Sequence, residues 1–197
     1  MAVKRITSPF DENIARSLNA GDNVLITGQI VTARDAAHKH LASTKESPLD
    51  LKGTVIYHCG PVAIKSGGAW KILAAGPTTS IREEPYEAGI IKNFRPAAIM
   101  GKGGMGAKTL DALKEFGCVY LHATGGAAAY LADCINGVKN VHFLDEFGQP
   151  EAMWVIEVTD FPAIVTMDSF GKSLHEELKI LSRKNLEKLI NLKTKPD

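Results

Sequence analysis

Residues 97–121, AAIMGKGGMGAKTLDALKEFGCVYL, contain two short apolar runs separated by a glycine-rich turn and a helical pattern. The first run, residues 97–100, leads straight into the glycines, and from Ala107 the apolar residues recur at helical spacing. Gly117 is expected to stop that helix before the second run, residues 118–121. Strand, glycine turn, helix and strand in this order predict a parallel βαβ unit, with functional groups at the carboxyl ends of its strands.

Similar patterns on both sides of this unit extend the predicted sheet. Apolar and β-branched runs predict strands over residues 24–30, 53–57, 70–74, 138–144, 152–158 and 163–167, with a turn at 65–68. Helices are expected after Pro9 and over residues 35–43, 127–135 and 173–192, the last with an apolar stripe. We therefore expect an α/β fold with a mixed sheet and βαβ units, forming one domain over residues 1–197.

The composition is that of an ordinary globular protein. Of the 197 residues, 45% are hydrophobic and 23% are charged, and the formal net charge is +1. A near-neutral chain lacks the clustered basic surface that is typical of nucleic-acid binding. No apolar run is long enough to span a membrane, and residues 1–5 lack the apolar segment of a secretion signal. We expect a cytoplasmic protein that binds neither nucleic acid nor a membrane.

The three cysteines, Cys59, Cys118 and Cys134, are far apart in the sequence and form no Cys-x-x-Cys pair. This spacing argues against a disulfide framework and against a metal site built from neighbouring ligands. Distant cysteines still ligate a cluster when a fold gathers them, but free cysteines are more often buried core residues. We expect no metal ligand in this chain.

Residues 32–41, TARDAAHKHL, place polar side chains where a strand is expected to become a helix. Arg34 and Asp35 come at the predicted helix start, and His38 follows Asp35 on the same helical face, which allows an Asp–His hydrogen bond. Taken alone, the motif has a simpler explanation, in which Asp35 caps the helix and His38 packs or faces water. Similar polar motifs elsewhere in the chain favour a functional role.

Six further motifs, most of them framed by glycine, occur in a fixed order along the chain. They are YHCGPV at 57–62, GPTTSIR at 76–82, MGKGGMG at 100–106, TGGAAA at 124–129, EVTDFP at 157–162 and DSFGKSL at 168–174. Together with the TARDAAH motif they resemble the β subunit of class I iron–sulfur fumarate hydratases and L(+)-tartrate dehydratases. That subunit is equivalent to the C-terminal domain of the single-chain enzymes, and the resemblance covers residues 21–174.

The resemblance implies a fold, a cofactor and a partner. The family's fold is a three-layer β/β/α swivelling domain. Its enzymes remove water from a hydroxy-dicarboxylate with a [4Fe–4S] cluster, which an α subunit holds while the β subunit completes the pocket. The resemblance therefore implies a hydro-lyase β subunit that works with an α partner, in an α2β2 assembly, on the fumarate–malate step of the tricarboxylic acid cycle.

Matching motif to motif assigns substrate contacts to four residues. The resemblance implies that Arg34 and Arg82 bind the substrate carboxylates, that Lys102 is the active-site lysine, and that Thr78 is the catalytic threonine and also touches substrate. A guanidinium fork suits a carboxylate through two hydrogen bonds, which agrees with a substrate that has two negative ends. Thr78 is a poor base by itself and needs a neighbouring cation such as Lys102, and its simpler role is to cap the turn.

The neighbours of these residues have other expected roles. Asp35 and His38 are expected to orient Arg34 rather than to react. One departure from the family pattern is His58-Cys59 before Gly-Pro, where family members more often carry a tyrosine or a small residue. This difference concerns local packing and not the order of the motifs.

The glycines around the expected active-site lysine predict an anion site. Gly101, Gly103, Gly104 and Gly106 let the backbone approach a ligand, and the helix that starts at Ala107 offers N–H groups to a carboxylate. A phosphate-binding P-loop is the rival interpretation, but that motif needs glycine directly before its lysine, and Ala107 precedes Lys108 here. A purely structural turn is the third interpretation.

The sequence thus leads to one hypothesis and two alternatives. The hypothesis is the β subunit of an iron–sulfur hydro-lyase that completes the dicarboxylate pocket for reversible hydration of fumarate to malate. The first alternative is a tartrate dehydratase β subunit, whose substrate differs by one hydroxyl that no residue here clearly recognises. The second is a non-catalytic anion-binding or regulatory domain that has kept the fold.

Overall fold

Five strands close into a ring in the computed structural model, which describes residues 3–193 and side chains as far as residue 190. They are β2 (Asn23–Thr32), β3 (Val55–Tyr57), β6 (Ala98–Gly101), β7 (Val119–His122) and β9 (Met153–Met167). The first four pair in parallel, and β9 closes the ring by pairing antiparallel with both β7 and β2. β1 (Val3–Ser8) adds in parallel to β2, and β8 (Ile135–His142) adds antiparallel to β9. The expected mixed sheet is confirmed, and its closure is new.

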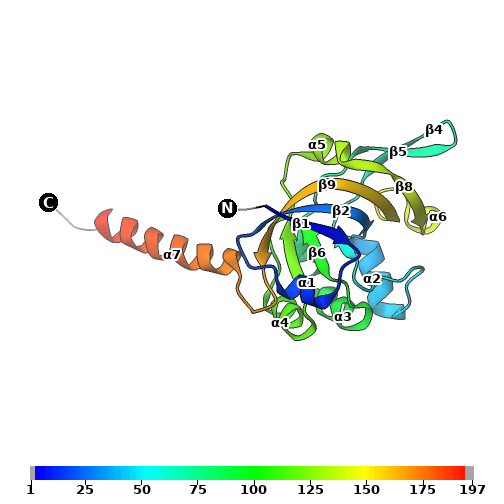
Figure 1. Cartoon of the computed structure of the whole chain (residues 1–197). Coiled ribbons are helices and arrows are strands. Elements are labelled where there is room, and N and C mark those ends of the chain that lie inside the picture. Colours follow the sequence, from blue (N-terminus) through cyan, green and yellow to red (C-terminus); the bar gives the residue numbers. More distant parts are fainter. Residues whose placement is uncertain (1–2, 194–197) are drawn as a thin grey trace.

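Helices cover the parallel wall of this ring. The helices are α1 (Glu12–Arg16), α2 (Asp35–Thr44), α3 (Glu84–Phe94), α4 (Ala107–Phe116), α5 (Ala128–Asp133), α6 (Leu144–Phe147) and α7 (Leu174–Lys193), with a 3-10 helix η1 (Ser80–Glu83). α2, α3 and α4 lie together on one side of the sheet, and β8 and α5 lie on the other (Figure 1). The predicted βαβ unit is therefore confirmed as β6–α4–β7, with Gly117 ending α4 at a φ of 65°.

Both faces of the parallel strands are buried, which explains their continuous apolar runs. Along β3, Val55 and Tyr57 belong to a core inside the ring, whereas Ile56 belongs to a second core beneath the helices. Trp154 of β9 fills the inner core, and Leu41 of α2 is fully buried in the outer one. The helices that carry the polar motifs are thus fixed to the sheet by a continuous apolar layer.

Two expected boundaries are wrong. The strands expected at residues 152–158 and 163–167 form one strand, β9, because the chain bulges without leaving the sheet. Asp160 adopts a φ of 50° at this bulge, and its N–H donates to Thr27 Oγ1 at 3.2 Å. The helix expected over residues 127–135 ends at Asp133, because pairing with β9 draws the following residues into β8.

Several elements come without a sequence prediction, among them β4 (Val62–Ser66) and α3. The turn expected at residues 65–68 is confirmed as a hairpin between β4 and β5 (Ala69–Ala74), in which β4 itself was not expected. Gly67 and Gly68 both have positive φ, 59° and 84°, which matches a two-residue hairpin turn. α3 also had no prediction, because it contains Gly89 and only a short apolar run.

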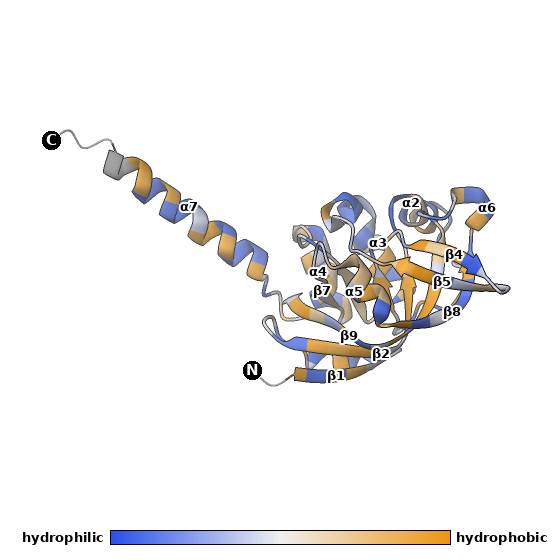
Figure 2. Ribbon diagram, turned by 90° about the horizontal axis from the view of Figure 1, so that it is seen from above, coloured by the Kyte–Doolittle hydropathy of each residue, from blue (hydrophilic) through white to orange (hydrophobic). Residues whose placement is uncertain are grey.

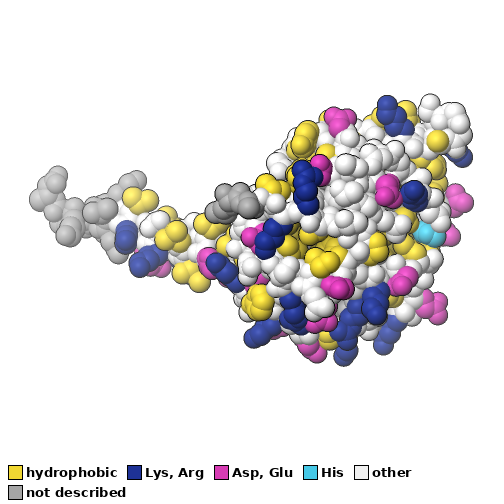
Figure 3. Space-filling model, viewed as in Figure 1, with side chains coloured by type: hydrophobic (Ala, Val, Ile, Leu, Met, Phe, Trp, Pro, Cys, Tyr) yellow, Lys and Arg dark blue, Asp and Glu magenta, His cyan; other side chains and the backbone are white. Residues whose placement is uncertain are grey.

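The C-terminal helix extends away from the rest of the domain. α7 is confirmed close to its expected bounds, and Figures 1 and 2 show it projecting into solvent with hydrophobic and hydrophilic residues interspersed along it. Leu178, Leu181 and Leu189 of the predicted stripe are 62%, 53% and 60% exposed. Figure 3 shows Lys and Arg side chains interspersed with Asp and Glu over the rest of that view. No helix within residues 3–193 is long and apolar enough to cross a membrane.

Candidate active site

The expected site residues lie at the carboxyl ends of β2, β3 and β6. Arg34 follows β2 at the start of α2, and Lys102 follows β6. Thr78 and Arg82 lie on the segment that follows β5. Backbone hydrogen bonds join this segment to the residues that follow β3 and β6. Thr78 N–H donates to the His58 carbonyl at 2.7 Å, and Lys102 N–H donates to the Thr78 carbonyl at 3.3 Å. Separate motifs are thereby joined at one edge of the sheet.

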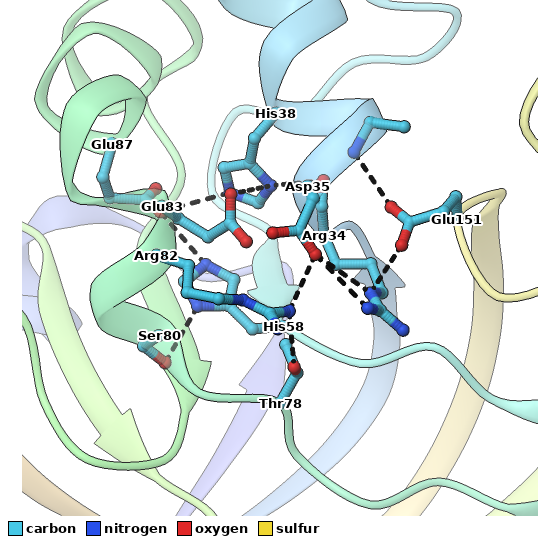
Figure 4. Close-up of polar contacts among 11 residues, drawn as sticks. Arg34, Asp35, His38, His58, Thr78, Ser80, Arg82, Glu83, Glu87 and Glu151 are labelled. Atoms are coloured by element: carbon cyan, nitrogen blue, oxygen red, sulfur yellow. Dashed lines mark hydrogen bonds and ion pairs between the residues drawn. The ribbon is translucent and has the colours of Figure 1, made fainter.

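Asp35 joins the two arginines. Arg82 Nη2 lies 2.7 Å from Asp35 Oδ2, and Arg34 Nη2 lies 3.3 Å from the same oxygen (Figure 4). Arg82 Nη2 also donates to Thr78 Oγ1 at 2.9 Å, so a cation lies beside the threonine hydroxyl. Both guanidinium groups therefore converge on one carboxylate, a geometry that would equally suit a carboxylate ligand.

The helix cap at this turn differs from the simpler explanation of the motif. The N-cap residue of α2 is Arg34, and Asp35 is the first helical residue, with its carboxylate turned toward the arginines. Glu151 caps the helix instead, because its Oε2 accepts from the Ala36 N–H at 2.9 Å. Its Oε1 lies 2.8 Å from Arg34 Nε. The sequence analysis missed Glu151, which comes from a loop 115 residues further along the chain.

Gly60 also shapes the arginine site. A Cβ at this position would lie 2.7 Å from Arg34 Nη1 and 2.5 Å from the Pro150 carbonyl oxygen. Arg34 therefore lies in space that only a glycine leaves open. The YHCGPV motif contained this signal, but the sequence alone did not connect it with Arg34.

His38 does not form the hydrogen bond to Asp35 that helical spacing allows. Its Nδ1 lies 3.1 Å from the Arg34 carbonyl oxygen, and its Nε2 lies 3.1 Å from Glu87 Oε2. His58 Nε2 lies 3.0 Å from the same Glu87 oxygen. All three side chains are fully buried. Figure 4 marks both contacts of Glu87 with dashed lines. Of this group only His38 was expected at the site.

A carboxylate of the chain itself bonds the start of α4, and the anion site expected around Lys102 stays a prediction. Glu84 Oε2 accepts from the Gly106 N–H at 2.7 Å and from Thr109 Oγ1 at 2.6 Å, so a carboxylate of the chain itself occupies the helix start. This contact also argues against the P-loop interpretation, because an acidic side chain accepts from the N–H group that a phosphate would use. Lys102 lies apart from this contact, with its Cδ 3.6 Å from where a Cβ of Gly125 would be.

The glycines of this segment serve different purposes. A Cβ on Gly101 would lie 2.0 Å from Ser80 Oγ, and a Cβ on Gly104 would lie 2.4 Å from the His175 ring. Gly103 has a φ of 84° and open space around it. Close packing explains Gly101 and Gly104, and backbone conformation explains Gly103.

The cysteines do not fit an iron–sulfur cluster. Cys59 and Cys118 are fully buried, and Cys134 is half-buried. Burial raises the pKa of the Cys59 thiol to about 12 and that of Cys118 well above its ordinary value, so both stay protonated at neutral pH. Among the described residues, none of the three cysteines belongs to a group of three or more side chains that lie close enough to share one metal ion. These residues are core thiols, as the sequence predicted.

Glu83 is a buried carboxyl group beside the arginines. Both of its oxygens lack a hydrogen-bond partner among the described residues, and its Oε2 lies 3.9 Å from His38 Nδ1. Burial raises the pKa of Glu83 from 4.5 to about 7; His38 opposes this rise, whereas Asp35 and Glu87 add to it. Glu83 therefore titrates near neutral pH.

The free energy of unfolding should fall as the pH is raised from 5 to 8, and we expect Glu83→Gln to make this fall smaller. The folded chain binds this proton more tightly than the unfolded chain, so Glu83 adds stability below about pH 4.5 that disappears as the pH rises through 7. The free energy of unfolding of the wild type should fall by about 2 kcal/mol more than that of the variant. Urea unfolding of both proteins at the two pH values measures this difference, and equal slopes would contradict the assignment.

Comparison with known proteins places the chain in a family. The family model described as fumarase C-terminus matches residues 3–178. The chain belongs to this family. The matched range includes every motif on which the sequence resemblance rests, and that resemblance is thereby confirmed.

Relatives of two architectures match the chain. A protein provisionally named class I fumarate hydratase from Geobacillus stearothermophilus is 56% identical over 95% of this chain but only 36% of its own length. The chain thus spans about a third of that relative. The L(+)-tartrate dehydratase subunit beta of Escherichia coli (strain K12) is 36% identical over 90% of this chain and 89% of its own length. A protein of Methanocaldococcus jannaschii, provisionally named as the same subunit, is 44% identical over 93% of its own length.

Proposed function

We propose that this chain is the β subunit of an iron–sulfur hydro-lyase that hydrates fumarate to malate reversibly together with an α subunit. The observation that carries the proposal is the convergence of Arg34 and Arg82 on one carboxylate beside Thr78, whose carbonyl accepts from the Lys102 N–H. The match to separate β subunits along nearly their whole length supports the division into two subunits. On this proposal residues 1–197 act as one cytoplasmic swivelling domain.

The arginines would bind the substrate carboxylates. Arg34 is only 24% exposed in its side chain and is fixed by Glu151, whereas Arg82 is 45% exposed. Arg34 is therefore the preorganised contact, and Arg82 is the one that is free to adjust. A bound dicarboxylate would accept from guanidinium N–H groups that are not bonded to Asp35, and Asp35 would continue to orient both guanidinium groups.

Thr78 and Lys102 would act at the reacting carbons. Arg82 Nη2 donates to Thr78 Oγ1, and a cation in this position stabilises the hydroxyl in its deprotonated form. This contact favours Thr78 as the proton acceptor over a purely turn-capping role. Lys102 is half-buried at the end of β6, where its ammonium group would add to the positive field on the substrate.

The iron–sulfur cluster would belong to the α subunit. The cysteines of this chain, none of which belongs to a group of close metal-ligating side chains among the described residues, support that assignment. An iron ion with an open coordination position supplies Lewis acidity toward the substrate hydroxyl. The share of this chain is to bind and orient the dicarboxylate and to move the proton. An α2β2 assembly is part of the same proposal.

Tartrate is the second candidate substrate, because several relatives carry a tartrate dehydratase name. The test is to mix the purified chain with a cluster-reconstituted α subunit and to assay fumarate hydration and tartrate dehydration side by side. Fumarate turnover that needs both subunits supports the proposal, and tartrate turnover alone would change the substrate. Activity of this chain without the α subunit and without iron would overturn the division of work.

A purely anion-binding domain is the remaining alternative. This alternative predicts that dicarboxylates bind when the chain and the α subunit are mixed, but that no substrate is converted. The turnover assay and a binding measurement by calorimetry together test this alternative. Binding of a dicarboxylate with no detectable product would favour a regulatory domain over an enzyme subunit.

A further inference from the structure

A row of fully buried polar side chains lies beneath the candidate site. It consists of His38, Glu87, His58, Ser80 and Tyr120. Glu87 of α3 is its centre, because its Oε2 lies 3.1 Å from His38 Nε2 and 3.0 Å from His58 Nε2. The two imidazole rings are 4.9 Å apart and meet edge to face. His38 belongs to α2 and His58 follows β3, so one carboxylate links three separate segments.

The row continues beyond His58 to the segment that carries Thr78 and Arg82. His58 Nδ1 lies 2.9 Å from Ser80 Oγ, and Tyr120 of β7 donates its hydroxyl proton to the same oxygen at 2.7 Å. Ser80 begins η1, between Thr78 and Arg82. The row therefore ends, on this side, within two residues of both proposed substrate contacts.

At its other end the row reaches Arg34. The Arg34 carbonyl oxygen can only accept a hydrogen bond, so His38 Nδ1 must carry a proton. The Glu87 carboxylate also accepts, so His38 Nε2 carries a proton as well and the ring is an imidazolium. His58 then needs only one proton, on Nε2, because Ser80 can donate to its Nδ1 after accepting from Tyr120.

The electrostatics agree with this arrangement of protons. Burial lowers the pKa of His38, but Glu87 and the more distant Glu83 outweigh burial, and the pKa lies above its ordinary value. For His58 burial wins over Glu87, and the pKa is lowered. Burial would raise the pKa of Glu87, yet the two imidazoles hold it at about 2. The charge of His38 also lowers the pKa of His58, whereas Asp35 raises it.

We propose that the buried row centred on Glu87 is a positioning device that sets the spacing between Arg34 and the Thr78–Arg82 segment. Glu87 acts as a clamp on which His38, one turn from Arg34, and His58, bound to Ser80, are both fixed. Two arginines on different loops can grip the two ends of one dicarboxylate only if their separation is held to a fraction of an ångström. The inference rests on the proposed function for its kinetic part alone.

The first arm of the test observes the protons in the full chain without any partner. Histidine side-chain nitrogen NMR should show His38 protonated on both nitrogens at pH 7, and His58 neutral with its proton on Nε2. Glu87→Gln should lower the pH at which His38 titrates, and Glu83→Gln should lower it less, because Glu83 is 3.9 Å away rather than 3.1 Å. A neutral His38 in the wild type would overturn the proposal.

The same three ligand atoms lie within 4.8 Å of one another, a grouping that a divalent metal ion also uses. Metal analysis of the purified chain therefore belongs to this arm. A stoichiometric ion that Glu87→Gln removes would replace the hydrogen-bonded clamp by a metal site and overturn the proposal.

The second arm measures positioning. Glu87→Ala should increase solvent exchange of the Arg34 Nε–H by about 10-fold, and Glu87→Gln, which can still accept and donate in place, should keep it near the wild-type rate. In the α–β complex, Glu87→Ala should raise KM for fumarate more than it lowers kcat, and Glu87→Gln should restore KM. Unchanged Arg34 exchange in a folded Glu87→Ala chain would overturn the clamp. A complex without turnover contradicts only the proposed function.

Discussion

Replacing Arg34 by alanine should lower kcat/KM of the α–β complex for fumarate by a factor of roughly 30 to several thousand, because truncating a charged contact at a desolvated site costs about 2–5 kcal/mol. Arg34 is the more buried of the two arginines, and Glu151 and Asp35 hold its guanidinium in place before substrate arrives. Steady-state hydration of fumarate, measured with a constant excess of α subunit, gives the ratio directly.

Three controls separate a lost substrate contact from a damaged fold. Arg5→Ala removes an arginine that is 68% exposed and pairs with Asp160 on the outside of the sheet, and it should leave kcat/KM unchanged. Arg34→Lys keeps the charge but loses the planar fork, and it should recover only part of the activity. The melting temperature of Arg34→Ala should stay within a few degrees of the wild type. Full activity of a folded Arg34→Ala chain would exclude Arg34 as the carboxylate contact.

Local patterns in the sequence were sufficient to predict the βαβ unit and most strands. The helix after Met100 and its stop at Gly117 follow from spacing and from one backbone conformation, which are properties of neighbouring residues. The closure of the ring by β9 could not be predicted in this way, because it depends on pairing with strands that are distant along the chain. The bulge at Asp160 was misread for the same reason, since it is defined by the partner strand.

In the candidate site, too, some residues could be predicted from local motifs and others could not. Arg34, Thr78, Arg82 and Lys102 were assigned from motif order, and their roles stay predictions although the fold brings their backbones together. Glu87 could not be predicted, because it lies on α3, whose sequence shows no clear helical pattern. The histidines that it contacts are 29 and 49 residues away along the chain. Motifs identify side chains that meet a ligand, whereas the side chains that hold them are spread over the chain and leave no local pattern.

Gly101→Ala should lower the free energy of unfolding by about 1–3 kcal/mol, which is the usual cost of overpacking a filled core. The new Cβ would lie 2.0 Å from Ser80 Oγ and 3.1 Å from His58 Cβ. Ser80 cannot turn away without losing its hydrogen bonds to His58 and Tyr120, so either those bonds break or β6 moves. Movement of β6 displaces Lys102, and kcat of the complex should fall by about 10-fold or more. Urea unfolding and steady-state kinetics of the same preparation measure both effects.

Two further variants decide why Gly101 is a glycine. Gly89→Ala, on the exposed side of α3 with nothing within 4 Å of the new Cβ, should stabilise the chain by about 0.5–1 kcal/mol. Ser80→Ala removes the clashing oxygen, so adding Gly101→Ala to it should cost less stability than in the wild type, which is a coupling between contacting residues. Suppose instead that glycine is needed at position 101 so that a ligand can approach closely. Gly101→Ala would then lower activity without lowering the free energy of unfolding, and it would lower activity equally in the Ser80→Ala background. A stability cost that Ser80→Ala relieves assigns Gly101 to the packing against Ser80 and His58 that supports the site.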